Sequence, residues 1–298
     1  MKNESQKSVF PFAANDYSRA LAAKSKAFAR QVYPSPEEDE YDDAPLDPFG
    51  ETGGAGACTG VPGLVQRFPD RVLAMAASSC FMNCRHCTRR NILGDAATIS
   101  APGALAAALE YVQAHPQVRD VLVSGGDPLV LGDDAVMRII DAFAALGQID
   151  VVRLCTRAPC TAPHRITQKL ARSLGASGKV WVNTQFNHPD ELTPDAVEAC
   201  RILVESGIPV SCQTVMLAGV NDSTSTMLAL FRALQRARVR PYYVFQCDPV
   251  RGTAHFRVPL EKAKRIALEC AERIGGLALP RFVADVPGAT RKIPLELL

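Results

Sequence analysis

The chain has 298 residues, of which 47% are hydrophobic and 21% charged, enough apolar material for one large core or two smaller ones. Its 33 basic and 31 acidic residues nearly balance, which speaks against nucleic acid as the main partner because such proteins neutralise phosphates with excess Lys and Arg. No apolar stretch reaches the roughly 20 residues of a membrane-spanning helix, and no long apolar block follows the first lysines. We therefore expect a soluble, cytoplasmic protein with neither a nucleic-acid nor a membrane partner.

The first 63 residues are predicted to form an extension. An amphipathic helical pattern covers residues 16–32, and the acidic run 37–43 follows it, which we expect to be a solvated face. The Gly-rich stretch 50–63 is typical of a linker. We therefore divide the chain into an N-terminal helical and acidic extension with its linker, residues 1–63, and a main domain, residues 64–298.

The main domain is predicted to be an α/β fold. Short β-branched runs predict six strands, at residues 72–77, 120–124, 151–156, 180–186, 210–217 and 241–247. Helical segments alternate with them, at residues 101–114, 133–146, 163–174, 194–206, 223–237 and 260–274. Such alternation indicates a parallel sheet with right-handed crossovers, either doubly wound or a barrel.

Polar residues follow most of these predicted strands. Ser124-Gly-Gly-Asp127 follows the second strand and Thr156-Arg157 the third, and similar segments at 187–189, 219–222 and 246–249 follow the next three. In both candidate folds the chemistry lies at the carboxyl ends of the strands. These segments therefore indicate the rim of an active site.

Three of the ten cysteines are spaced as ligands. Cys80, Cys84 and Cys87 form a C-x3-C-x2-C pattern after the first predicted strand, whereas most of the others are scattered singly in apolar runs, where cysteine behaves as a small hydrophobe. A structural zinc site usually takes four protein ligands, and the only nearby fourth candidate is His86. A 4Fe-4S cluster with three cysteine ligands is favoured, because it leaves one iron open to a small molecule.

The cysteine pattern and a series of further motifs resemble the lysine 2,3-aminomutase family of radical S-adenosylmethionine (SAM) enzymes. The resemblance rests on Cys84-Arg-His-Cys87-Thr-Arg-Arg90, on Val61-Pro-Gly-Leu64 and Arg67-Phe-Pro-Asp-Arg71, on Phe186-Asn-His-Pro189, Gly219-Val-Asn-Asp222 and Arg240-Pro-Tyr-Tyr243, and on Gln246-Cys-Asp248 and Asp285-Val-Pro-Gly288. It implies a partial (β/α)6, TIM-like barrel with the N-terminal helical part appended. It also implies a 4Fe-4S cluster whose open iron binds SAM, which one electron cleaves to a 5'-deoxyadenosyl radical.

By the same resemblance, Ser124, Gly125, Gly126 and Asp127 bind SAM. An ordinary tight turn is the alternative explanation for the glycines. An external one-electron reductant, a flavodoxin- or ferredoxin-like protein, is an implied partner, and the formation of a homo-oligomer stays open.

Moving an amino group implies a second cofactor, pyridoxal 5'-phosphate (PLP), held by a lysine Schiff base. Lys292 keeps the family spacing from Asp285-Val-Pro-Gly288 and is the expected catalytic PLP lysine. Arg67 and Arg71 match positions that contact the PLP phosphate, which suits the forked donors of arginine. The chain departs from the family at Phe68, where a tyrosine is usual, and at residues 289–291, where a glycine run is usual.

The resemblance also implies the substrate contacts. Arg89 matches the arginine that pairs with the substrate carboxylate, and Asp248 and Asp285 match the two acids that hold the terminal ammonium of lysine. We expect a 2,3-aminomutase that moves the α-amino group of a basic L-amino acid, lysine first, to the β carbon. Gln185 and Phe245 replace a usual histidine and tyrosine, so an arginine enzyme or a desaturase stays open.

Two further expectations concern zinc and catalysis. Ser223 stands where clostridial-type relatives have a zinc-binding cysteine, and the chain ends six residues after Lys292, so we expect no structural zinc. From a different functional class, the chain could be a non-catalytic Fe-S cluster-binding regulator. The retention of Lys292, Arg89 and both aspartates favours an enzyme.

Overall fold

The computed structural model describes residues 10–40, 42–51, 58–90, 93–94 and 96–298. Residues 1–9 and 52–57, which belong to the predicted extension and linker, lie outside this set. Nine described strands form one sheet in chain order, from β1 to β9. They are β1 (Leu64–Phe68), β2 (Arg71–Ala77), β3 (Asp120–Gly125), β4 (Val151–Cys155), β5 (Val180–Thr184), β6 (Val210–Met216), β7 (Arg240–Gln246), β8 (Arg281–Ala284) and β9 (Ile293–Pro294).

The strands from β2 to β8 are parallel to their neighbours, whereas β1 pairs with β2 and β9 with β8 in antiparallel fashion. The six predicted strands correspond to β2–β7, so the prediction of a partial (β/α)6 barrel is confirmed. The prediction missed β8 and the two antiparallel edges. Among the described residues, β1 and β9 are not hydrogen-bonded to each other, so the barrel stays open.

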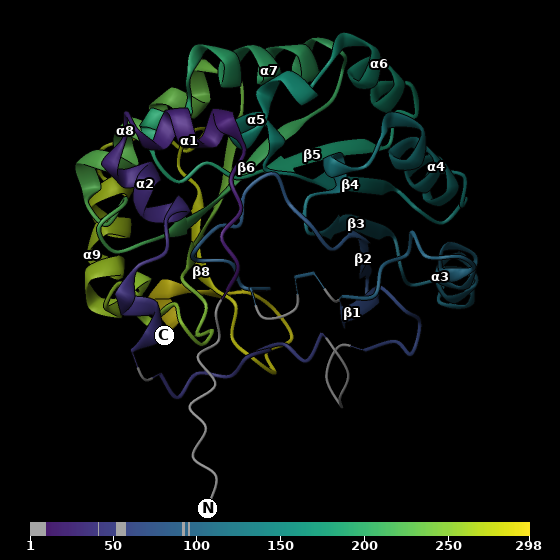
Figure 1. The fold of residues 1–298 in the computed structure, drawn as a ribbon, viewed down its shortest axis with the longest axis horizontal. Coiled ribbons are helices and arrows are strands. Elements are labelled where there is room, and N and C mark those ends of the chain that lie inside the picture. Colours follow the sequence, from purple (N-terminus) through teal and green to yellow (C-terminus); the bar gives the residue numbers. More distant parts are fainter. Residues whose placement is uncertain (1–9, 41, 52–57, 91–92, 95) are drawn as a thin grey trace, which may run out of the picture.

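The main helices lie on the outside of the curved sheet, where they form an arc in Figure 1. They are α3 (Ala104–Ala114), α4 (Asp133–Ala144), α6 (Gln168–Ala176), α7 (Pro194–Glu205), α8 (Thr224–Arg236) and α9 (Leu260–Ala271). A short helix, α5 (Ala158–Thr161), follows β4. Single 3-10 turns lie at Pro36–Asp39, Pro128–Val130, Pro163–Arg165, Pro189–Glu191, Ala254–Phe256 and Leu295–Leu297.

Local capping decides where the helices begin. Gly103 has a φ of 76°, a left-handed conformation that no helix contains, so α3 begins three residues later than predicted. The Thr167 side chain accepts a hydrogen bond from Leu170 N and caps α6, which moves its start from the predicted 163 to Gln168. Thr193 caps α7, and Pro194 follows at the first helical position, where its missing N–H does no harm.

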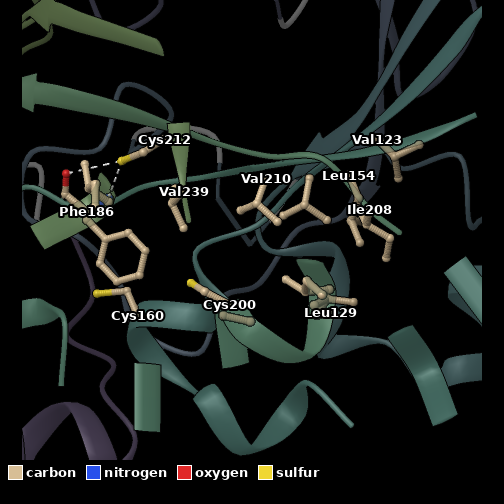
Figure 2. Close-up of a cluster of buried hydrophobic side chains, with 14 of the residues drawn as sticks. Val123, Leu129, Leu154, Cys160, Phe186, Cys200, Ile208, Val210, Cys212 and Val239 are labelled. Carbon is tan, nitrogen blue, oxygen red and sulfur yellow. Dashed lines mark hydrogen bonds between the residues drawn. The ribbon is translucent and has the colours of Figure 1, made fainter. Parts of the chain in front are cut away.

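The core lies between the outer face of the sheet and the helices. Side chains alternate along each strand, and in β4 Val152 and Leu154 are fully buried in this layer. Figure 2 shows the layer around β3–β6, and the labelled residues there are Val123, Leu129, Leu154, Cys160, Phe186, Cys200, Ile208, Val210, Cys212 and Val239. Cys160, Cys200 and Cys212 are buried among apolar neighbours, as expected for the cysteines outside the ligand pattern.

The N-terminal pattern at residues 16–32 forms two helices, α1 (Asp16–Ala22) and α2 (Lys26–Val32). Ser25 interrupts the pattern because its side chain accepts a hydrogen bond from Phe28 N and caps α2. Leu21, Phe28 and Val32 belong to the same hydrophobic cluster as the barrel core. The extension therefore contributes to the barrel's own core.

The expectation that the acidic run is a solvated face is wrong for two of its residues. The Glu38 side chain is 6% exposed and forms ion pairs with Arg85 at 2.5 Å and Arg90 at 2.6 Å. The Asp42 side chain is 4% exposed and pairs with Arg257 at 2.6 Å. The cause is tertiary: the run lies against cationic side chains of the barrel that are distant in the sequence.

Among the described residues, every helix is too short or too polar to cross a lipid bilayer.

Candidate active site

A cavity of about 620 Å³ lies inside the curve of the sheet. It is lined by every residue that the sequence analysis assigned to the site, namely Arg67, Arg71, Cys80, Cys84, Cys87, Arg89, Ser124, Gly125, Gly126, Asp127, Asp248, Asp285 and Lys292. These residues come from positions between 67 and 292 of the chain. The structure therefore brings the predicted site residues together in one place, while their individual roles stay predictions.

Strand alternation explains why the cavity is polar. Val152 and Leu154 of β4 face the helices, so Arg153 and Cys155 face the cavity. In β7, Val244 is buried in the core, whereas Tyr243 and Phe245 line the cavity. The same strands therefore present an apolar face to the helices and a face of polar and apolar side chains to the cavity.

The cysteines lie on the loop that leaves β2. Burial, followed by the neighbouring Cys84 thiol, raises the pKa of Cys87 to about 11. The pKa of Cys80 is also raised, by burial first and by the Cys87 and Cys84 thiols next. Thiolates in such a place need compensating positive charge, which bound iron supplies.

Within the described residues, no three His, Cys, Asp or Glu side chains are placed to hold a single metal ion. In a 4Fe-4S cluster each cysteine would bind a different iron atom, so the three thiols need not meet at one point. The donor set of this site is therefore compatible with the 4Fe-4S cluster that the sequence indicated.

Arg157 is a buried cation beside the cysteine loop, for which the sequence analysis proposed no role. Its Nη1 donates a hydrogen bond to Cys84 Sγ at 2.9 Å, and its Nη2 donates to Gln31 Oε1 at 2.7 Å and Glu191 Oε2 at 3.1 Å. Burial disfavours the charged guanidinium, but Cys84 and Glu191 outweigh it and hold the pKa of Arg157 above its usual value. In the sequence, only the position of Arg157 directly after a predicted strand indicated that it could lie in the site.

The Ser124-Gly125-Gly126 segment passes very close to the backbone that leads into the cysteine loop. A Cβ on Gly126 would lie 2.2 Å from Ser79 O, and one on Gly125 would lie 2.4 Å from Ala77 O. Gly125 also has a φ of 106°. Both glycines are therefore required by packing, whatever they bind.

Asp127 organises this loop through its own hydrogen bonds. Its carboxylate accepts from Thr156 Oγ1 at 2.7 Å, from Arg157 N at 2.8 Å and from Leu129 N at 3.0 Å. Burial raises the pKa of Asp127, although these hydrogen bonds oppose the shift. Asp127 thus ties the end of β3 to the end of β4 and holds Arg157 in place.

Asp285 lies between two cations at the other side of the cavity. Arg67 donates two hydrogen bonds to it, at 2.7 and 3.2 Å, and Lys292 Nζ donates one at 2.6 Å. Burial would raise the pKa of Asp285, but the hydrogen bonds and charges of Arg67 and Lys292 lower it below its usual value. The predicted PLP lysine is therefore adjacent to a predicted substrate acid.

The replaced positions also surround the cavity. Lys292 Nζ lies 4.9 Å from the ring centroid of Phe245 and 5.5 Å from that of Phe68. The Arg71 guanidinium carbon, Cζ, lies 4.3 Å from the ring centroid of Phe68. Gln185 Nε2 contacts His86 Nε2 at 3.1 Å. The two phenylalanines keep a ring surface beside Lys292, and a cation or a flat heterocycle packs favourably on such a surface.

Asp248 is a buried acid with an unused oxygen. Thr88 donates a hydrogen bond to its Oδ2 at 2.8 Å, but Oδ1 has no partner among the described residues. Burial, opposed by the Thr88 hydrogen bond and reinforced by Asp285, raises the pKa of Asp248 to about 6. A buried acceptor without a donor is costly, so this oxygen indicates a place for a cationic ligand group.

Arg89 is paired with Glu51, which the sequence analysis missed. Its Nε donates to Glu51 Oε2 at 2.6 Å and its Nη2 to Glu51 Oε1 at 2.8 Å. Glu51 stands in the stretch 50–63 that was assigned to a linker, and no spacing rule relates it to Arg89. The only indication of a role for Glu51 in the sequence was that it is a single acidic residue in a Gly-rich stretch.

The cavity as a whole favours anions. Its described lining carries eight cationic side chains and four carboxylates. The cations are Arg67, Arg71, Arg89, Arg153, Arg157, Arg281, Arg291 and Lys292, and the carboxylates are Glu51, Asp127, Asp248 and Asp285. Phosphate and carboxylate groups would therefore be attracted to the cavity, whereas Asp248 provides a separate place for a cationic group.

Comparisons with known proteins agree with this geometry. The sequence model of the radical SAM superfamily matches residues 77–231. The chain is 41% identical over 267 residues to an L-lysine 2,3-aminomutase of Fusobacterium nucleatum, covering 89% of this chain and 62% of that protein. It is 36% identical over 260 residues to a glutamate 2,3-aminomutase of Clostridioides difficile, covering 87% of this chain and 60% of that protein.

The chain thus spans about three fifths of the length of these two relatives. Among solved structures, a radical SAM methyltransferase from Sphaerobacter thermophilus is similar with a TM-score of 0.55 at 17% identity, covering 76% of this chain and 69% of the other. At that identity the similarity supports the fold alone.

Proposed function

Because the chain belongs to the radical SAM superfamily, within the lysine 2,3-aminomutase family, we propose that it is a PLP-dependent aminomutase that moves the α-amino group of L-lysine to the β carbon. When bound, the cluster and SAM supply a radical that removes a substrate hydrogen, and PLP supplies the carrier for the migrating nitrogen. The enzyme also needs an external one-electron reductant, for which a small flavodoxin- or ferredoxin-like protein is the proposed partner.

The chain's own residues divide these tasks. Cys80, Cys84 and Cys87 would hold the cluster, with Ser124, Gly125, Gly126 and Asp127 beside SAM, and Lys292 would hold PLP, whose phosphate fits Arg67 and Arg71. Arg67 and Lys292 are the two partners of Asp285, so engaging PLP frees that carboxylate. The cavity lies inside the barrel, which keeps water away from a reactive radical.

The substrate assignment rests on one observation, the unpartnered Oδ1 of Asp248. A terminal ammonium would satisfy it with a charge-assisted hydrogen bond and would also pair with Asp285. A glutamate side chain would bring a third carboxylate to two acids, which is unfavourable. Arg89 suits the α-carboxylate at the other end of the same substrate.

Anaerobic turnover with mass spectrometry tests the proposal. The reconstituted protein is incubated with SAM, PLP, a strong reductant and a mixture of L-lysine, L-arginine and L-glutamate. We expect a β-amino isomer of lysine with unchanged mass, separated by chromatography. A β-isomer of arginine or glutamate, or a product lighter by two hydrogens, would contradict the substrate or the reaction.

The Lys292→Ala variant is the control for the PLP assignment. It should abolish turnover, because no other amine is proposed to hold PLP, and it should leave SAM binding intact, because the cysteine loop is unchanged. Product formation by this variant would show that Lys292 is not the PLP lysine. Wild-type protein that neither cleaves SAM nor changes any amino acid would favour a non-catalytic cluster protein.

A further inference from the structure

The Arg89–Glu51 ion pair lies in the cavity, and its acidic member, Glu51, has no part in the proposed mechanism. Two hydrogen bonds of 2.6 and 2.8 Å join the guanidinium to the carboxylate. The Glu51 side chain is 5% exposed and the Arg89 side chain 21%. Both residues line the cavity. A bidentate pair of this kind fixes the plane of a guanidinium as well as its position.

Glu51 occupies only one edge of that guanidinium. Arginine has five N–H donors, and Glu51 accepts from Nε and Nη2. Within the described residues, no acceptor takes a hydrogen bond from Nη1. With respect to the described residues, the edge formed by Nη1 and the remaining N–H of Nη2 is therefore available, and such an edge can bind a second carboxylate in a fork.

We propose that Glu51 is a positioning residue that holds Arg89 with its free edge turned to the substrate's α-carboxylate. This inference rests on the proposed function, in which Arg89 binds that carboxylate. Glu51 acts through Arg89 and does not touch the reacting atoms. It thereby places one end of the amino acid, while Asp248 and Asp285 place the other.

The opposite arrangement would make Glu51 a competitor that the substrate displaces. The free edge makes displacement unnecessary, because one guanidinium can bind two carboxylates at once. Displacement would also leave the Glu51 carboxylate buried and unpaired, which is strongly unfavourable. Pairing has a further consequence: burial disfavours charge on Arg89, but Glu51 more than compensates and raises the pKa of Arg89 above its usual value.

Calorimetric binding to the PLP-loaded protein, without SAM or reductant, separates positioning from turnover. L-lysine is compared with L-lysinamide, which lacks the carboxylate. In the Glu51→Ala variant we expect the Kd for L-lysine to rise about tenfold or more, the effect of losing a charge-assisted hydrogen bond. The Kd for L-lysinamide should change little, and Glu51→Gln should restore part of the lysine affinity through its remaining acceptor.

Two further variants make the test specific. Asp42→Ala removes an equally buried carboxylate that pairs with Arg257, and because Asp42 does not line the cavity its loss should change neither Kd. In an Arg89→Ala background, Glu51→Ala should have no additional effect, because the two residues act as one unit.

The inference is overturned if Glu51→Ala binds lysine more tightly, which would identify a competitor, or if lysine and lysinamide weaken equally, which would indicate a general structural loss. It is also overturned if wild type binds lysine and Glu51→Ala binds it equally well, and in that case the proposed function stands. Wild-type protein that binds none of the basic amino acids would overturn both. Should Glu51→Ala fail to fold, the same comparison is made with Glu51→Gln, where a smaller loss confined to lysine is expected.

Discussion

Asp248 shows how a single residue links substrate binding to stability. Its carboxylate is buried, with one oxygen bonded to Thr88 and the other unpartnered among the described residues. Burial raises its pKa to about 6, above the ordinary value for an aspartate in the unfolded chain. The folded protein therefore holds the Asp248 proton more tightly than the unfolded chain does. Stability from this residue is present below about pH 4 and is lost as the pH rises through about 6.

The Asp248→Asn variant should accordingly be more stable than wild type at pH 8, by about 1 to 3 kcal/mol. The gain should shrink at pH 4.5, where wild-type Asp248 is mostly protonated in the folded state. Urea unfolding at the two pH values measures the difference. A gain of the same size at both would contradict the assigned cause.

The same residue sets a pH dependence for binding. A protonated Asp248 cannot pair with an ammonium group, so wild-type affinity for L-lysine should strengthen as the pH rises through about 6. The Asp248→Asn variant should bind lysine weakly throughout and lack this step. Calorimetric titrations at pH 5, 6, 7 and 8 would show it, and a step that persists in the variant would assign the titration to another group.

At the scale of elements, the site depends on how closely the end of β3 approaches the end of β2. Gly126 N donates a hydrogen bond to Ala77 O at 2.6 Å, and Asp127 N donates to Ser79 O at 2.8 Å. A Cβ at Gly126 would lie 2.2 Å from Ser79 O and 2.8 Å from Ser79 N. Because those neighbours are backbone atoms, they cannot rotate away as a side chain could.

Gly126→Ala should therefore shift the start of the cysteine loop and lower both thermal stability and the iron bound per chain after reconstitution. The matched control is Gly132→Ala, because a Cβ there meets nothing within 4 Å and its φ of −67° suits alanine. Differential scanning fluorimetry and iron analysis compare the two. Equal iron content in both variants would show that this close approach does not position the cluster ligands.

At the scale of the whole molecule, ion pairs beside the cavity bridge the two ends of the open sheet. Arg67 lies on β1 at one end of the strand order, and Asp285 and Lys292 lie between β8 and β9 at the other. The Arg67–Asp285 pair joins residues 218 positions apart. These ion pairs therefore connect the two ends of the nine-stranded sheet across the site proposed for PLP.

A ligand that binds at this junction should stabilise the entire fold. At a concentration 100 times its Kd, PLP should add about 2.7 kcal/mol to the free energy of unfolding, seen as a rise of several degrees in Tm. At the same concentration, pyridoxal, which lacks the phosphate, should give a smaller rise because it lacks the contacts that the phosphate would make with Arg67 and Arg71. Equal shifts with the two compounds would contradict the phosphate contacts.

The strands and helices of the main domain were predictable from the chain because they depend on short-range patterns, whereas the partial barrel and the cofactors were implied by the family resemblance. Alternation such as that of residues 151–155 identifies a strand and its two faces, and the C-x3-C-x2-C spacing places three cysteines, the predicted cluster ligands, on one loop. Three strands were missed: β1, which directly follows the stretch assigned to a linker, and β8 and β9, which span 4 and 2 residues and are too short to carry a pattern of their own. β8 and β9 are recognisable as strands from their pairing, β8 with β7 and β9 with β8.

The tertiary structure determines which charged and polar side chains of the site become partners. Glu51 with Arg89, Arg157 with Cys84, and Glu38 with Arg85 and Arg90 are pairs between segments 38 to 73 positions apart. A charged side chain looks the same in the sequence whether it faces solvent or an opposite charge, since burial and partner depend on how the whole chain packs. The sequence by itself therefore determined the fold and the residue types of the site, and packing determined their pairing, because the energy of a buried charge depends on neighbours that only the folded chain brings near.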